Sequence, residues 1–231
     1  LFNVLLSVFY IVLNKYTNQN DITIGTTKAG RSRKTMSVFG YFINSMPIRC
    51  RIEPEKRYKD FLSELKSDLE EAQNNEKISF ASIIEQIQPE RTQEKQPLFN
   101  ALFTFQKTIK RFGKSGLANL SMGESGGEIN VGEITLLPRA STFRTVPFDI
   151  TLFISDTGEE LVAAFHYKKE LYYAELIENM LKDYRFILDS ILADEEEELA
   201  AIIADSASMK TFAIDFGHNQ RHHEMLGNVL H

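Results

Sequence analysis

The sequence predicts an α/β fold, because stretches with the periodicity of helices are interspersed with short runs of strand character. The helical stretches cover residues 1–16, 58–73 and 174–192, and the β-branched and aromatic runs cover residues 22–25, 98–106, 129–137, 146–152 and 161–167. A chain of 231 residues, 43% of them hydrophobic, can bury a sizeable core as one large domain or two small lobes. We therefore expect a two-layer α+β body in which amphipathic helices cover a sheet.

The first helix is apolar on nearly every side. Its face consists of Phe2, Leu5, Leu6, Phe9, Leu13 and Tyr16, widened by Val4, Val8, Ile11 and Val12. A helix of this composition must be buried on most sides. Because the run lacks the basic flank and the cleavage site of a signal peptide, we interpret it as a helix cut out of a longer polypeptide.

The elements that follow have simpler patterns. An amphipathic stripe predicts the helix at 58–73, through Tyr58, Phe61, Leu62, Leu65 and Leu69. Ser79 is a candidate N-cap for a second helix that ends at Ile87. Phe99, Phe103 and Phe105 stand at even spacing, which puts them on one face of a strand and indicates core packing.

The second half of the chain predicts a long loop, then strands, then a closing helix. Glycines among polar residues indicate a mobile loop over residues 107–127. The strand-like runs from residue 129 onward predict a β-meander with a hairpin turn at Thr157-Gly158. The last of these runs, residues 161–167, is apolar enough for a central strand.

Residues 22–52 carry the most unusual pattern. A short apolar run breaks at Gly25, a basic polar loop follows, and the aromatic run 39–43 again has strand character. Asn44 stands inside this second apolar run, where a buried amide must find hydrogen-bond partners. Two interpretations are open, because the Asn44 side chain can either satisfy a neighbouring backbone or serve a binding site.

Several residues of this stretch form motifs with a fixed order and spacing. They are Asp21, Ile24 and Gly25, then Gly30 and Arg31, then Gly40, Phe42, Asn44, Pro47 and Arg49 in the pattern GxFxNxxPxR. These motifs resemble the C-terminal half of a condensation domain of nonribosomal peptide synthetases. Similar segments farther on are Pro97-Leu98-Phe99, Pro147-Phe148-Asp149 and Tyr167 with Leu171 and Tyr172, so the resemblance covers residues 1–192. The family's pattern before the second helix is kept at Asn75 and Phe80, and the sequence departs from it at Ser79 and Ala81.

The resemblance implies one lobe of the chloramphenicol-acetyltransferase-like fold, which is a mixed β-sheet with helices on one face. Residues 1–193 would form this C-terminal lobe, and residues 194–231, which open with the acidic run 194–198, would be a linker or a tail of uncertain order. Condensation domains join an aminoacyl or peptidyl thioester to an amine in antibiotic and other secondary-metabolite biosynthesis. Both substrates are carried on phosphopantetheine arms of carrier proteins, and no cofactor is expected to bind this chain directly.

In the family, the reaction takes place in a tunnel between two lobes. The residues that would line this tunnel are Gly40, Phe42, Asn44 and Arg49. Arg49 would lie close to Asn44. Gly30 and Arg31 would belong to a floor loop over residues 26–37, and a Gly-rich segment through Pro147 would be a latch to the other lobe. The family's catalytic histidine, which takes or steers the amine proton, belongs to an HHxxxDG motif in the N-terminal lobe. This chain lacks the motif, so we expect no catalytic residue in it and no activity from it alone.

The same resemblance implies the partners, which are the N-terminal lobe, peptidyl and aminoacyl carrier proteins and a neighbouring adenylation domain. If the N-terminal lobe normally covers this one, we expect an exposed apolar surface on the helix that opens at Leu1 or on the sheet, with dimerisation or poor solubility as a consequence. The net charge of −6 argues against a nucleic-acid surface. No apolar run has the length of a membrane span, and the single Cys50 suits a reducing cytoplasm, where we expect the protein.

Two other functions stay open. His222 and His223 open a run that reads HHxxxGN, and chloramphenicol acetyltransferases carry HHxxxDG near the C-terminus. The chain would then be a complete small acyltransferase, dependent on CoA or a carrier, with His223 as general base. The second alternative is a non-catalytic module that docks a carrier protein. Epimerisation and heterocyclisation domains share the fold, and the motif that separates them lies upstream.

Other candidate sites are weaker. His166 alternates with core positions, so we expect a structural histidine. Residues 123–127 lack the Lys-Ser/Thr of a phosphate loop. No spacing typical of a metal site is found, so we expect no metal.

Overall fold

The computed structural model describes residues 1–31, 33–75, 78–88, 97–107, 116–140, 146–158 and 160–208. Within these ranges the elements are α1 (Phe2–Thr17), β1 (Asp21–Ala29), β2 (Ile43–Arg51), α2 (Tyr58–Asn74), α3 (Phe80–Ile87), β3 (Ala101–Lys107), α4 (Gly116–Met122), β4 (Ile129–Val131), β5 (Ile134–Leu136), β6 (Ile150–Asp156), β7 (Leu161–Tyr167), α5 (Ala174–Ala193) and α6 (Leu199–Ser208). The three long helices predicted from periodicity are all present, each within two residues of its expected ends.

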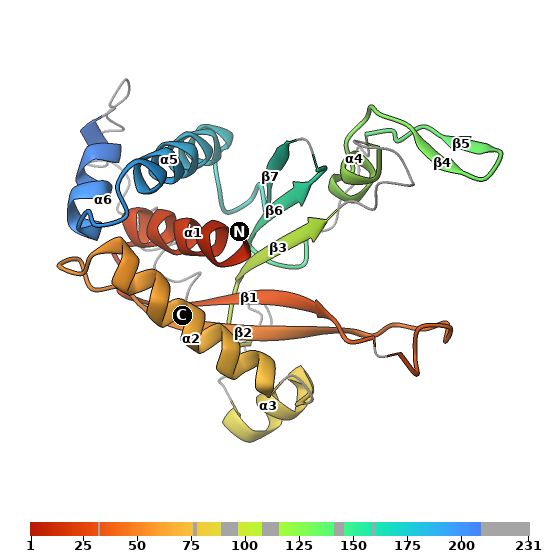
Figure 1. Ribbon diagram of the computed structural model, residues 1–231, viewed down its shortest axis with the longest axis horizontal. Helices are drawn as coiled ribbons and strands as arrows, with labels where there is room; N and C mark the ends of the chain where they lie inside the picture. The colour runs from red at the N-terminus through yellow and green to blue at the C-terminus, as the bar shows by residue number, and fades with distance from the viewer. Residues whose placement is uncertain are drawn as a thin grey trace.

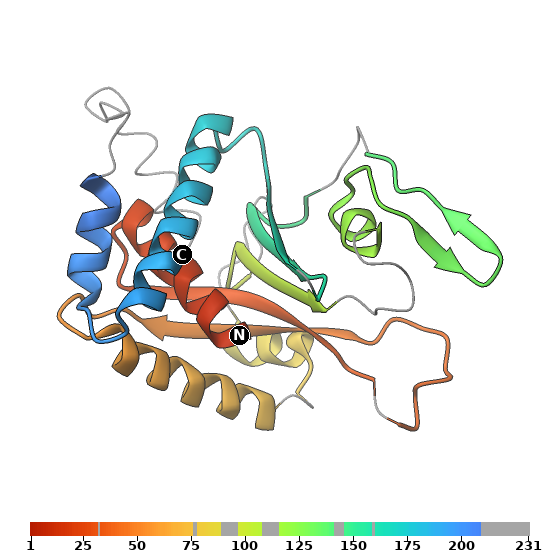
Figure 2. The same cartoon turned by 45° about the horizontal axis from the view of Figure 1, so that its top comes forward.

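A five-stranded sheet with the order β2-β1-β3-β6-β7 forms one layer (Figure 1). β3 pairs in parallel with both β1 and β6, whereas the outer pairs β1–β2 and β6–β7 are antiparallel. Helices α1, α2, α5 and α6 gather on one side of this sheet, and their apolar side chains share one core cluster with it (Figure 2). The predicted mixed α/β sheet with helices on one face is confirmed.

Helix α1 lies at the centre of the core, as its apolar composition predicts, so the alternative expectation of an exposed apolar surface on this helix is wrong. It contacts β1, β3, α2, α5 and α6. Two buried tyrosines also fix its position by hydrogen bonds: the Tyr10 hydroxyl donates to the Ile48 carbonyl at 2.6 Å, and the Tyr184 hydroxyl donates to the Leu5 carbonyl at 2.8 Å. Burial raises the pKa of both phenols, so they remain neutral donors at physiological pH.

Strand β3 packs on α1 through two of the three predicted phenylalanines. The rings of Phe103 and Phe105 meet Phe2 edge to face, with centroids 5.3 and 6.2 Å apart. Phe99 is buried, as predicted, but it does not lie on the strand, because β3 begins only at Ala101. The Phe99 ring instead stacks on Phe148 at 5.3 Å, outside the main core cluster.

The predicted meander is also only partly correct. The turn at Thr157-Gly158 and the β6–β7 hairpin are present, with Gly158 at φ 85°. However, β7 is an edge strand rather than a central one, and β4 and β5 form a separate two-stranded sheet. Residues 116–122, predicted as part of a loop, form helix α4, in which Ala118 and Met122 are buried.

Residues 194–208 pack on the rest of the chain. Helix α6 buries Leu199 and Ile202 in the same core cluster as α1 and α5. The acidic run before it is held at the start of α2, where Glu196 pairs with Arg57 and Lys59. A division of the chain at residue 193 stays a prediction.

Candidate functional site

The motif residues singled out in the sequence lie along the ribbon of β1 and β2. The two strands pair from Asp21 opposite Arg51 to Ala29 opposite Ile43. This ribbon runs out beyond the helices, and the loop that joins its strands, residues 30–42, projects at one end of the molecule (Figure 1). We call residues 30–42 the β1–β2 loop. It is shifted from the expected floor loop, because residues 26–29 still belong to β1 and the aromatic run 39–42 precedes β2.

Arg31 is the hydrogen-bonding centre of the β1–β2 loop. Its Nη1 donates to the carbonyls of Thr35 and Val38 at 3.0 and 2.8 Å. Its Nη2 donates to the Gly40 carbonyl at 3.1 Å. The guanidinium carbon also lies 4.5 Å from the centre of the Phe42 ring, in a cation–π arrangement.

Two glycines allow this close packing. The Gly30 N–H donates to the Phe42 carbonyl at 3.0 Å, and a Cβ on Gly30 would lie 2.5 Å from that oxygen. A Cβ on Gly40 would lie 3.3 Å from the Phe42 ring. The structure therefore brings Gly30, Arg31, Gly40 and Phe42 together and gives each a structural reason.

The β1–β2 loop exposes several large hydrophobic side chains among its basic residues. Large hydrophobic side chains that face solvent there are Met36, Val38, Phe39 and Tyr41, and Ile43 at the start of β2 continues the patch. Phe39 is fully exposed. Several large apolar side chains exposed on one loop are typical of an interaction site.

Asn44 stands at the start of β2 and binds the entry of α3. Its Nδ2 donates to the Ile78 carbonyl at 3.0 Å, and its Oδ1 accepts from the Phe80 N–H at 3.1 Å. Between these two residues Ser79 caps the helix, because its hydroxyl accepts from the Ser82 N–H at 3.1 Å. This geometry matches the interpretation in which Asn44 satisfies a neighbouring backbone. Any role of Asn44 in a tunnel is then one of positioning α3.

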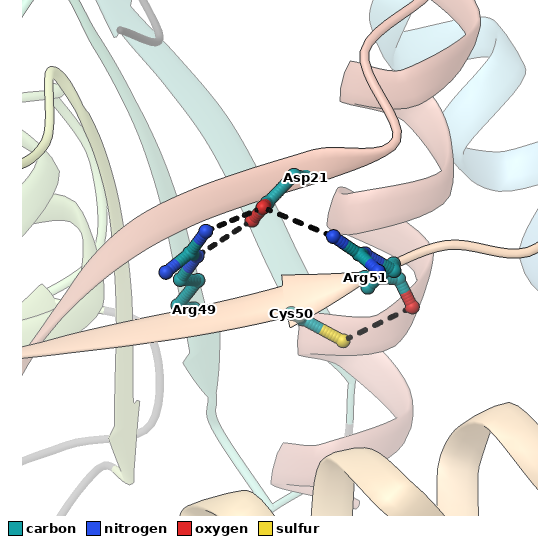
Figure 3. A network of polar contacts seen from close by, with 4 residues as sticks. All are labelled: Asp21, Arg49, Cys50 and Arg51. Carbon is teal, nitrogen blue, oxygen red and sulfur yellow. Dashed lines mark hydrogen bonds and ion pairs between the residues drawn. The ribbon is translucent and has the colours of Figure 1, made fainter.

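Arg49 lies away from Asn44. The two are five positions apart on β2, roughly 17 Å along a strand, and on opposite faces by the alternation of the pleat. Arg49 makes a two-bond ion pair with Asp21, with Nε–Oδ1 and Nη2–Oδ2 distances of 2.8 and 2.6 Å (Figure 3). The hydrogen bonds and the charge of Asp21 raise the pKa of Arg49. The expected proximity of Arg49 to Asn44 is therefore wrong, and Arg49 joins the two strands instead.

Side chains with reactive groups are sparse in the described part of the chain. Burial is the main cause that raises the pKa of the Cys50 thiol to about 12, so it is not a nucleophile at neutral pH. His166 is half-buried and stacks on Phe153 with ring centroids 5.6 Å apart. Among the described residues no group of three or more potential metal ligands comes together. His222 and His223 lie outside the described residues.

A second arm projects at the same end of the molecule as the β1–β2 loop. It consists of α4 and the β4–β5 hairpin (Figures 1 and 2). The hairpin exposes large hydrophobic side chains, which are Val131, Ile134, Leu136 and Leu137. A two-stranded sheet is marginal in water without a covering surface, so this arm too has the character of a contact element.

Comparison with known proteins decides the family. The model of the condensation domain family matches residues 1–214. The chain belongs to the condensation domain family. No helix in the described residues is long and apolar enough to cross a membrane.

The related condensation-domain sequences come from peptide synthetases. Tyrocidine synthase 2 of Brevibacillus parabrevis is 30% identical over 203 residues, which cover 87% of this chain and 5% of that protein. Gramicidin S synthase 2 of Brevibacillus brevis is 29% identical over 195 residues, 84% of this chain and 4% of that protein. The phosphinothricin tripeptide synthetase PhsC of Streptomyces viridochromogenes is 26% identical and covers 99% of this chain and 20% of that protein. The chain thus spans only a small part of each relative.

Solved structures confirm the fold. A four-domain nonribosomal peptide synthetase bound to AMP and glycine superposes with a TM-score of 0.73 at 25% identity, over 87% of this chain and 15% of that chain. The condensation domain of the monacolin K polyketide synthase MokA gives a TM-score of 0.66 at 21% identity, over 86% of this chain and 42% of that chain. The mixed sheet and its helix layer are therefore those of the condensation-domain fold.

Sequence reasoning missed three features of this site. Asp21 was part of a motif, but its bond to Arg49 depends on strand pairing. The bonds of Arg31 to three carbonyls depend on the path of the loop. The exposure of Phe39 and Tyr41 was missed because an aromatic run has strand composition. A usable signal was Gly40 between two aromatic residues, since glycine is depleted from strands.

Proposed function

We propose that this chain is the C-terminal lobe of a condensation domain in a nonribosomal peptide synthetase. The domain forms the amide bond between aminoacyl and peptidyl groups carried as thioesters on the phosphopantetheine arms of carrier proteins. The proposal rests on the family match over residues 1–214 and on relatives that are synthases of peptide antibiotics. An adenylation domain is the proposed neighbour in the same polypeptide.

The main support for the half-domain proposal is a comparison of how much of each chain is aligned. The chain aligns over 86% of its own residues with only 42% of the MokA condensation domain. More than half of that domain therefore has no counterpart in this chain. In the proposal, the missing part is the N-terminal lobe, which supplies HHxxxDG and its histidine, while this lobe supplies one wall of the tunnel.

The two projecting arms support this arrangement. Both the β1–β2 loop and the β4–β5 hairpin expose large apolar side chains, and both project at the same end of the molecule (Figure 1). In the proposal, the N-terminal lobe covers them. The proposed tunnel contacts are then Gly40, Phe42 and the α3 entry that Asn44 holds, with Gly30 and Arg31 shaping the loop below.

The reaction divides between the lobes. The acceptor amine attacks the thioester carbonyl and its proton passes to a base. The C–S bond then breaks, and the phosphopantetheine sulfur leaves as a thiolate that takes up this proton. In the proposal, the base comes from the N-terminal lobe. The described residues of this chain contribute orientation and exclusion of water.

Reconstitution from two separate lobes tests the proposal. Carrier proteins loaded with donor and acceptor amino acids are mixed with this chain, with the N-terminal lobe, and with both. We expect the dipeptidyl thioester only with both lobes, and its loss when the second histidine of HHxxxDG is replaced by alanine. Product from this chain alone, abolished by His223→Ala, would instead show a complete small acyltransferase.

A further inference from the structure

The shape of the β1–β2 loop depends on one side chain. Backbone hydrogen bonds close its base, from the Gly30 N–H to the Phe42 carbonyl at 3.0 Å, and form one turn, from the Val38 N–H to the Thr35 carbonyl at 3.1 Å. Arg31 links these two parts, because its guanidinium donates to carbonyls four, seven and nine positions ahead. The loop is thus folded around a guanidinium rather than around an apolar core.

This arrangement is specific for arginine. The planar guanidinium donates from two nitrogens in fixed directions while its face lies over an aromatic ring. Arg31 uses both properties at once, with three carbonyl bonds and the Phe42 ring 4.5 Å from Cζ. The ammonium group of lysine is a compact charge without a flat face, so it cannot reproduce this set of contacts.

The bonds of Arg31 also explain why the apolar side chains face outward. A loop rich in large hydrophobic residues normally buries them and leaves its carbonyls to water. Here the carbonyls of Thr35, Val38 and Gly40 face the guanidinium, while Phe39 and Tyr41 face solvent. A surface prepared in this way loses less conformational freedom when a partner covers it.

We propose that Arg31 is a positioning residue that holds the β1–β2 loop in a preformed shape, with Met36, Phe39 and Tyr41 presented to the N-terminal lobe. The partner rests on the proposed function, whereas the effect on the loop concerns this chain alone. Arg31 does not need to touch the substrates or the partner.

The first experiment uses this chain by itself. Chymotrypsin cuts after exposed aromatic residues, and cleavage after Phe39 or Tyr41 requires the loop to open. We expect chymotrypsin to cut the Arg31→Lys variant at these two sites about tenfold faster than the unsubstituted chain. The reason is that the loop opens more often once the guanidinium no longer binds the three carbonyls. Arg33→Lys, the same change at another exposed loop arginine, should leave the rate unchanged. Equal unfolding temperatures for all three show that only the loop has changed.

The second experiment measures binding of the N-terminal lobe to this chain. We expect Arg31→Lys to raise the Kd about tenfold and Arg33→Lys to leave it unchanged. Unchanged cleavage of Arg31→Lys would overturn the positioning role. Faster cleavage with an unchanged Kd would overturn the link between loop shape and docking but leave the proposed function standing. If the parent lobes do not associate, the proposed function fails, and the cleavage rates alone decide the role of Arg31.

Discussion

Two polar residues of the β1–β2 motif, Arg31 and Asn44, bind backbone groups of this chain. Arg31 binds three carbonyls of its loop, and Asn44 binds a carbonyl and an N–H at the start of α3. Neither presents a free charge at a reaction centre. Both therefore have the properties of positioning residues, whose replacement changes geometry rather than removes a reacting group.

Replacement of Asn44 by aspartate tests the positioning role, because it changes only the amide nitrogen to an oxygen. Asn44→Asp keeps the oxygen that accepts from the Phe80 N–H, but puts a carboxylate oxygen against the Ile78 carbonyl. We expect the free energy of unfolding to fall by at most about 1 kcal/mol, since one partly exposed hydrogen bond is lost.

The kinetic effect should exceed the loss of stability. In the two-lobe assembly we expect kcat for amide formation to fall about tenfold, with the KM for the acceptor carrier unchanged. Ser45→Ala, next to Asn44 but on the other face of β2, is the control. Full turnover by Asn44→Asp would remove Asn44 from the reaction.

Residues whose partners are close in sequence could be predicted, and those with distant partners could not. Ser79 was found as an N-cap because its acceptor role involves Ser82, three residues on. The partners of Arg49 and Asn44 lie 28 and 34–36 residues away. The pairing of β1 with β2 decides the first, and the packing of α3 against β2 decides the second. Composition alone does not contain that information.

At the scale of elements, the starts of α2 and α6 cap each other. The N–H groups of Tyr58 and Lys59 donate to the carbonyls of Glu197 and Glu195 at 2.9 and 3.0 Å. In return, the first N–H groups of α6 donate to the carbonyls of Lys56 and Pro54, both at 2.9 Å. The first N–H groups of a helix have no acceptor inside the helix. The segment before each of these helices therefore supplies carbonyl acceptors to the start of the other helix.

The ion pairs of Glu196 with Arg57 and Lys59 strengthen this contact in a pH-dependent way. The hydrogen bonds from Lys59 and Arg57 lower the pKa of Glu196, so its contribution to stability is complete above the ordinary pKa of glutamate and is lost as the pH falls through the lowered value. We expect Glu196→Gln to lower the unfolding temperature at pH 7, and the difference to shrink as the pH falls below the ordinary pKa of glutamate and through the lowered value. Glu195→Gln is the control. A difference that does not change with pH would contradict the ion-pair account.

Helix α6 should matter more to stability than any of these surface pairs. Ile202 is completely buried, whereas Ile87 on α3 is 57% exposed. We expect Ile202→Ala to cost about 3 kcal/mol of unfolding free energy by leaving a cavity, and Ile87→Ala well below 1 kcal/mol. Denaturant titration of both variants checks this. Similar small losses would mean that α6 is not part of the folded lobe.

Helix positions could be predicted well and the strand order could not, for a physical reason. Periodicity reports whether one face of a segment is buried, and it located the helices that begin at Phe2, Tyr58 and Ala174. It does not report which strand lies beside which. The apolar run of β7 therefore suggested a central strand, although the run lies at an edge with half-buried side chains.

At the scale of the whole molecule, burial is uneven. The helix layer and the sheet enclose a continuous core, while both arms expose large apolar side chains at one end (Figure 2). A monomer gains nothing from such exposure in water. The distribution fits a lobe whose arms are covered in the complete domain.

Self-association of the isolated chain follows from the same exposure. We expect sedimentation to show concentration-dependent dimers or larger species, because apolar arms can cover one another. Phe39→Ser, which removes the most exposed ring of the β1–β2 loop, should shift the distribution towards monomer. Lys34→Ser in the same loop is the control. A parent chain that stays monomeric at high concentration would contradict this expectation.

Hydrogen exchange of this chain, with and without the N-terminal lobe, shows whether the two arms are the surface on which the lobes meet. We expect new protection in the β1–β2 loop, residues 30–42, and in the β4–β5 hairpin, residues 129–136, with little change in α5 and α6. Protection confined to α5 and α6, or none at either arm while the lobes are bound, would contradict the view that the arms hold the two lobes together.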